Sequence, residues 1–88
     1  MSWVGEVSVT MKNMMLDNKW QQLTDGTKTV KLQILNMPVR YAECNTAPGD
    51  SSPFFTLQPG LYEAGPEISY VRADMQSAFI VVAEKIAP

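Results

Sequence analysis

The side chains that most often carry out chemistry in proteins are few in this chain of 88 residues. One cysteine, Cys44, and no histidine are present, so a cysteine–histidine nucleophile and the common zinc sites are excluded. A single thiol also cannot form an intrachain disulfide. The nine carboxylates lie singly along the sequence, whereas a calcium site needs clustered oxygen ligands. We therefore expect no cofactor, no metal and no catalytic residue, and we predict that the chain is not an enzyme.

Charge and hydropathy argue against two further classes of partner, nucleic acid and membrane. The formal net charge is −2, and the seven basic residues are spread out without forming a basic stripe, so nucleic-acid binding is not expected. No apolar run approaches the ~20 residues that a membrane-spanning helix needs. The first residues, Met1 to Glu6, lack the positive flank and apolar stretch of a secretory signal. We expect a protein that is made, and at least initially used, in the cytoplasm.

The elements that would position any site are predicted from alternating apolar residues. Residues 6–11 alternate, with Val7, Val9 and Met11 on one face, and residues 29–34 alternate more regularly. A period of two is typical of half-buried antiparallel strands. Residues 68–73 and 77–83 complete the set, and the latter is apolar on both faces, as expected of a central strand or one covered by a neighbour.

Turn residues separate these runs at intervals of about ten residues. Asp25-Gly26 is a strong hairpin signal, and residues 42–53 have the composition of an exposed loop. Short strands with frequent turns predict an all-β fold, namely a small antiparallel β-sandwich or jelly-roll-like barrel with an extended N-terminal segment. We divide the single domain into an N-terminal strand or arm at residues 1–19 and a β-sandwich at residues 20–88. Only residues 11–22 also allow a helix, and we favour the extended alternative there.

Large apolar side chains beyond the needs of a core suggest contacts with other molecules. Phe54 and Phe55 are adjacent, so on a strand they would point to opposite faces. Methionine adapts to irregular contact surfaces. A domain this small, without disulfide or zinc, also gains stability from burying surface in an assembly. The predicted interface residues are Trp3, Met14, Met15, Phe54, Phe55, Leu61 and Tyr62. Arg40 and Arg72 lie in strand-like runs and are open to two interpretations, a partner contact or a solvated face.

A series of short motifs gives the chain a family resemblance. The motifs are Trp20-Gln21-Gln22-Leu23, a Val-x-Leu-x-Ile strand from Val30, Val39-Arg40-Tyr41, Leu57-Gln58-Pro59-Gly60, Val71-Arg72-Ala73 and Ala78-Phe79-Ile80-Val81-Val82. In this order they resemble the small β-sandwich modules of tailed-bacteriophage virion proteins. The resemblance covers about three quarters of the chain and leaves out the first nineteen residues. The motifs are structural and include no catalytic signature.

The resemblance implies a structural protein of the virion, assembled in the host cytoplasm. Its leading form is a capsid decoration or cement protein that binds major capsid proteins and itself, as a homotrimer or another symmetric oligomer. A tail, head-fibre or fibre-attachment component is the alternative within the virion. A receptor- or carbohydrate-binding module is a separate alternative, with Trp20, Tyr62 or Tyr70 stacking on sugar rings.

Overall fold

The computed structural model describes residues 8–86 of the 88-residue chain, and every regular element in that range is a β-strand. The strands are β1 (Ser8–Leu16), β2 (Gln21–Asp25), β3 (Thr29–Ile34), β4 (Val39–Glu43), β5 (Phe55–Leu57), β6 (Gly60–Ala64), β7 (Ile68–Ala73) and β8 (Ala78–Ile86). Within the described range, no helix is long and apolar enough to cross a membrane.

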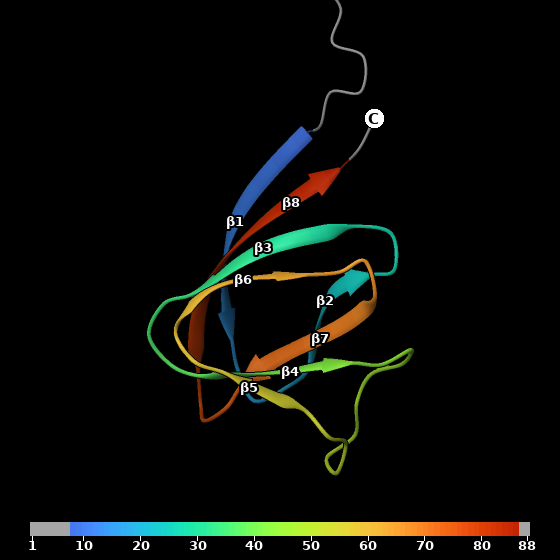
Figure 1. Ribbon diagram of the computed structural model, residues 1–88. Helices are drawn as coiled ribbons and strands as arrows, with labels where there is room; N and C mark the ends of the chain where they lie inside the picture. Colours follow the sequence, from blue (N-terminus) through green and yellow to red (C-terminus); the bar gives the residue numbers. More distant parts are fainter. Residues whose placement is uncertain (1–7, 87–88) are drawn as a thin grey trace, which may run out of the picture.

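The strands form two four-stranded antiparallel sheets that pack as a sandwich (Figure 1). One sheet has the order β1-β8-β3-β6, and the other has the order β2-β7-β4-β5. The chain passes from one sheet to the other at every connection except the one between β4 and β5. This is the arrangement of a double-sheet jelly roll. The predicted fold class, a small antiparallel β-sandwich or jelly-roll-like barrel, is therefore confirmed.

The core lies between the two sheets and follows the alternation seen in the sequence. On β3, Val30, Leu32 and Ile34 are buried, while Lys31 and Gln33 point outward. The other sheet contributes inward residues from β2, β4 and β7 in the same manner. The buried apolar cluster consists of Leu16, Leu23, Val30, Leu32, Ile34, Val39, Tyr41, Ala64, Val71, Ala73, Ala78, Ile80 and Val82.

The segment for which the sequence left a helix open is extended. It consists of β1, a bend at Asn18 and Lys19, and β2. Strand β1 is an integral part of the first sheet, because it pairs with β8 from Ser8↔Ile86 to Leu16↔Ala78 without a break in register. Residues 1–7 of the predicted N-terminal arm lie outside the described residues.

The Asp25-Gly26 turn forms, but it does not close a hairpin. Gly26 has a φ of 96°, and the backbone N–H and hydroxyl of Thr27 both donate to Asp25 Oδ1, at 3.0 and 2.6 Å. These hydrogen bonds hold the pKa of the Asp25 carboxyl below its usual value. The turn joins β2 and β3, which lie in different sheets. The dipeptide therefore marks the reversal correctly, while the pairing partner of β2 is the distant β7.

Candidate interaction surface

The outward side of the β1-β8-β3-β6 sheet is the most unusual surface of the molecule. The registers of its strands place the outward residues in rows across the sheet. One row contains Asn13, Val81, Gln33 and Leu61, and the next contains Met11, Ala83, Lys31 and Glu63. We call this surface the apolar face and define it by Val9, Met11, Asn13, Met15, Lys31, Gln33, Leu35, Leu61, Glu63, Phe79, Val81 and Ala83.

Six large apolar side chains of this face are open to solvent. Their exposed fractions are 71% for Leu61, 67% for Met11, 65% for Met15, 58% for Val9, 49% for Leu35 and 46% for Phe79. The outward side of an antiparallel sheet that faces water normally carries polar residues. Single exposed apolar residues are common, whereas contiguous groups of this kind are often sites of contact with another molecule.

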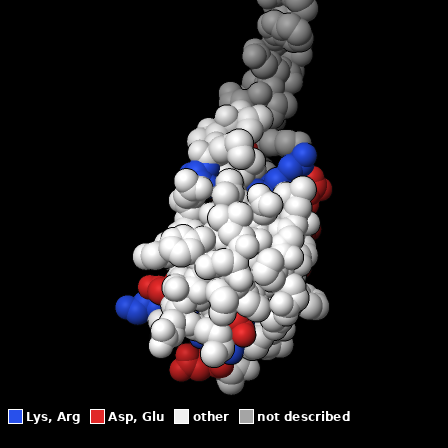
Figure 2. Space-filling view, turned by 90° about the vertical axis from the view of Figure 1, so that its left-hand side faces the viewer, with Lys and Arg blue, Asp and Glu red and all other residues white. Residues whose placement is uncertain are grey.

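Charge is sparse on the apolar face. Of the twelve residues that define the face, two are charged, Lys31 and Glu63, and they lie directly opposite each other on β3 and β6. Lys85 occupies the β8 position opposite Val9, at the end of this face. Figure 2 views the molecule from the side on which this sheet lies in Figure 1, and it shows a wide uncharged area with charged groups toward its margins. A shallow hollow of about 150 Å³ lies on the face, lined by Met11, Lys31, Gln33, Leu61, Val81 and Ala83.

The apolar face continues to one end of the sandwich. The N–H of Leu35 donates to the carbonyl of Phe79 at 3.1 Å, which extends the β3–β8 pairing one residue beyond β3. The N–H of Phe79 in turn donates to Asn36 Oδ1 at 3.1 Å. Beyond them, Met37 and Met75 are exposed by 39% and 63% and line a second open hollow with Gln76 and Ser77. The exposed methionines thus prolong the apolar surface over the β3–β4 and β7–β8 connections.

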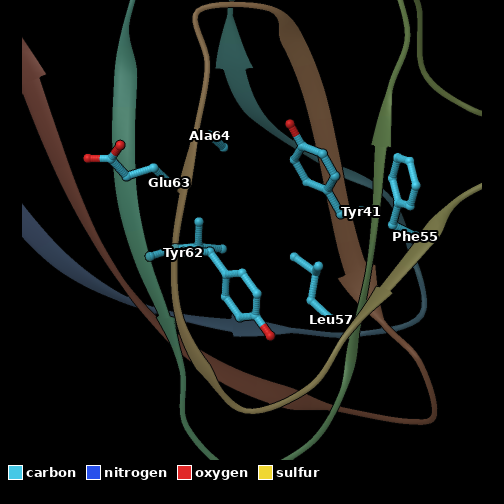
Figure 3. A pocket seen from close by; sticks show the side chains of 7 residues that line it. Tyr41, Phe55, Leu57, Tyr62, Glu63 and Ala64 are labelled. Atoms are coloured by element: carbon cyan, nitrogen blue, oxygen red, sulfur yellow. The ribbon is translucent and has the colours of Figure 1, made fainter.

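A different kind of hollow lies at the open edge between β4–β5 and β6. It has a volume of about 160 Å³ and is lined by Leu32, Tyr41, Phe55, Leu57, Tyr62, Glu63 and Ala64. Figure 3 shows Tyr62 and Leu57 directed into the gap between the strands, with Glu63 turned away from it. The Tyr62 hydroxyl donates to the carbonyl of Gln58, and the Tyr41 hydroxyl donates to Glu43 Oε2, each at 2.8 Å.

The chemistry available in this edge hollow is limited. Burial, followed by the hydrogen bond to Glu43, raises the pKa of Tyr41 to about 12, so its phenol stays protonated at neutral pH and cannot act as a base. Both phenols already have acceptors within the chain. The hollow can therefore hold an apolar or ring-shaped group against side chains whose hydroxyls are already paired within the chain.

The outward side of the other sheet carries cations that are matched within the chain. Arg40 and Arg72 lie opposite each other on β4 and β7. The Arg40 guanidinium is 4.4 Å from the centre of the Phe54 ring, and its Nε lies 2.9 Å from Asp74 Oδ1. The Arg72 guanidinium lies 5.8 Å from the Trp20 ring. Each arginine thus stacks on an aromatic ring of its own sheet surface.

The structure separates the residues predicted as interface candidates into three groups. Met15 and Leu61 lie on the apolar face, where they are exposed. Phe54, Phe55 and Tyr62 lie around the β4–β5–β6 edge, with Phe55 exposed by 67% and Tyr62 partly buried. Met14 points to the inner side of β1 and packs against the core. Trp3 lies outside the described residues.

Sequence reasoning missed Val9, Met11, Leu35 and Phe79 as members of the exposed surface. The usable signal was the run from Ala78 to Val82, which is apolar at both inward and outward positions. In the structure, Ala78, Ile80 and Val82 are buried, and Phe79 and Val81 belong to the apolar face.

The comparisons with known proteins give no relative from which a function could be inferred. No family model, curated protein or solved structure matches the chain. Across residues 8–86, no group of three or more His, Cys, Asp or Glu residues is placed to hold a metal ion. Cys44 is half-buried, and its N–H donates to the carbonyl of Ile68 at 3.2 Å. The apolar face is therefore the surface from which we argue function.

Proposed function

We propose that the chain is a non-enzymatic structural component of a tailed-bacteriophage virion, which attaches to the particle through its apolar face. The observation that carries the proposal is the exposure of Leu61, Met11, Met15, Val9, Leu35 and Phe79, by 46–71%, on one side of one sheet. Four strands spaced by about 4.8 Å and six residue steps of about 3.3 Å give this face an area of roughly 400 Å². This area includes the polar residues Asn13, Lys31, Gln33 and Glu63, and the apolar residues make up the rest; the largest apolar patch on a single protein is often functional.

The virion assignment has two weaker supports. Residues 20–84 resemble modules of phage virion proteins, and jelly rolls occur in viral capsid proteins. The second support is an analogy between folds, and unrelated functions share this fold. Within a virion, we favour a decoration or cement protein on the capsid, bound to major capsid proteins and to further copies of itself. A tail, head-fibre or fibre-attachment component remains the alternative form of this proposal.

Two measurements test the proposal. Mass spectrometry of purified particles of the phage whose genome encodes the chain should detect it in fixed proportion to the major capsid protein. The purified chain should also co-sediment with particles that lack it, and Phe79→Asp should abolish that binding. Gln22→Asp, an equal charge change at an exposed position of β2 in the other sheet, is the matched control and should bind as wild type. Absence of the chain from the particles, or unchanged binding by Phe79→Asp, would contradict the proposal.

The edge hollow supports a second candidate, a receptor- or carbohydrate-binding module. Tyr41, Phe55 and Tyr62 line it, and rings of this kind can stack on sugar faces. A glycan array probed with the wild-type chain tests this candidate. Binding that is lost in Phe55→Ala and kept in Phe79→Asp would favour it over the virion proposal, and an array without hits would remove it.

A further inference from the structure

Strand β1 is the longest free edge among the described residues. Strands β1, β6, β2 and β5 are the edges of the two sheets. β1 has nine residues, whereas β6 and β2 have five each and β5 has three. Within residues 8–86, only β8 pairs with β1. The other side of β1 therefore presents a row of backbone N–H and C=O groups that another strand can bind.

Of the devices that normally protect a sheet edge, β1 has a single charge, Lys12, and neither a proline nor a bulge. Proteins blunt such edges with prolines, bulges, short strands or charges. β1 contains no proline, and its register with β8 is unbroken. Its only charged residue, Lys12, has its ammonium 3.3 Å from Glu84 Oε1 of the same chain. By contrast, β2 contains a register shift between Gln22 and Thr24, and β5 lies between Pro53 and Pro59.

We infer that β1 pairs antiparallel with β1 of a second copy of this chain, around a two-fold axis at Asn13. An axis perpendicular to the sheet keeps the two apolar faces on the same side, which restricts the register to pairs of equal parity. With the axis at Lys12, the two Lys12 side chains would lie directly opposite each other, and like charges in that position are destabilising. With the axis at Met11, the polar Asn13 would face Val9 of the second copy. With the axis at Asn13, Met11 faces Met15 of the second copy, each Lys12 faces Met14, and the two Asn13 side chains face each other.

Strand β1 of a second copy fits this edge better than strand β2 or β6 of a second copy does. Pairing around Asn13 joins residues 10–16 of the two copies, a longer ladder than the five-residue edges β2 and β6 can offer. A two-fold arrangement also closes on itself, whereas pairing of β1 with β6 of the next copy would continue into a ring or filament. The pairing uses the edge of the sheet and leaves its face free. A failure of the pairing would therefore leave the proposed virion role unaffected, and a failure of the virion role would leave the pairing unaffected.

Disulfide formation tests both the pairing and its register. In a Cys44→Ser background, Asn13→Cys should form a covalent dimer on mild oxidation, because residues on the two-fold axis lie opposite each other with Cβ atoms about 4.5–5.5 Å apart. Gln33→Cys, on the same face but on β3, is the control and should stay monomeric. An equal mixture of Thr10→Cys and Met14→Cys chains reports the register around Lys12, because only that register places residue 10 opposite residue 14. Cross-linking of Asn13→Cys no faster than that of Gln33→Cys would overturn the inference, as would faster cross-linking of the mixture.

Sedimentation without cross-links separates edge pairing from face packing. The wild-type chain should show a concentration-dependent dimer, and Met11→Lys should weaken it about tenfold, which corresponds to about 1.4 kcal/mol. Leu61→Lys places the same charge on β6 at the far side of the face and should leave dimerisation unchanged. Equal weakening by Leu61→Lys would mean that the faces pack on each other, and a wild-type chain that stays monomeric at its solubility limit would also exclude the pairing.

Discussion

The outward surfaces of the two sheets are built on the same alternation but carry different side chains. On β7 and β4, the outward Arg72 and Arg40 stack on Trp20 and Phe54, and Arg40 also binds Asp74. On β8, the outward Phe79 is exposed by 46%. The arginines of the β2-β7-β4-β5 sheet thus have partners within the chain, whereas the β1-β8-β3-β6 sheet leaves large apolar side chains in solvent. Because only inward residues form the core, the composition of an outward surface is free to reflect contacts with other molecules.

If the two sides of β8 differ in this way, the inward Ile80 should contribute to stability and the outward Phe79 to binding. The largest effect on the free energy of unfolding is expected at Ile80. Ile80 is fully buried, so Ile80→Ala should lower the free energy of unfolding by about 2–5 kcal/mol, through lost burial and the cavity that remains. Urea unfolding followed by Trp fluorescence measures this loss. A loss below about 1 kcal/mol would indicate that the space between the sheets collapses around the smaller side chain.

A smaller effect is expected on the opposite sheet. Arg40→Ala removes the ion pair with Asp74 and the stacking on Phe54, and both groups are partly exposed to solvent. We expect the free energy of unfolding to fall by about 0.5–1.5 kcal/mol. Asp74→Asn removes the ion pair and keeps the stacking, so it should cost less. Neither variant should change binding to particles. A binding defect as large as that of Phe79→Asp would contradict the conclusion that only the apolar face contacts the particle.

Glu84 should make a pH-dependent contribution at the end of the sandwich. Its carboxylate lies 3.3 Å from the ammonium groups of both Lys12 and Lys28. Burial opposes its ionisation, but hydrogen bonds and charge from the two lysines outweigh burial and hold its pKa below the ordinary 4.5. The ionised form thus stabilises the folded state at neutral pH, and this stability is lost as the carboxyl protonates below about pH 4.5.

Glu84→Gln should therefore be less stable than wild type at pH 7, and the difference should disappear at acidic pH. Urea unfolding of both proteins across this range gives the measurement. A difference that is constant with pH would mean that the side chain acts through packing rather than charge.

The smallest effect on the isolated molecule is expected from the apolar face itself. Phe79→Thr keeps a residue that favours strands and should change the free energy of unfolding of the monomer by no more than about 0.5 kcal/mol. The measurement requires dilute protein, so that association does not contribute. If Phe79→Thr destabilised the monomer as much as Ile80→Ala does, the two positions would not differ and the apolar face would be part of the core.

The sequence predicted the fold class because its longer strands alternate clearly. On β3, the inward set is entirely apolar and the outward set is polar, so both the element and its orientation followed from the residues. Strands β2, β5 and β6 were not predicted by periodicity, because they have only three to five residues. Their positions depend on pairing with strands far along the chain, which local sequence does not encode.

The candidate surface was harder to predict for a related reason. In β1, Val9 and Met11 do share a face, as the alternation indicated, but that face points outward. The inward set contains Lys12 and Met14, so composition alone does not distinguish the two sides of the strand. The register with β8 determines the orientation, because Leu16 pairs with the buried Ala78. A contact between residues more than sixty positions apart thus decides which methionines are exposed.

The pairing of β1 with β8 has a consequence for how the protein is made. Residues at the beginning of the described chain, such as Ser8, have their strand partners near its end, such as Ile86. During synthesis, β1 stays unpaired until β8 has left the ribosome. Folds dominated by such distant contacts form slowly, and strands that wait exposed are prone to aggregate. Yield in the cell should therefore depend on the interval between translation of β1 and translation of β8.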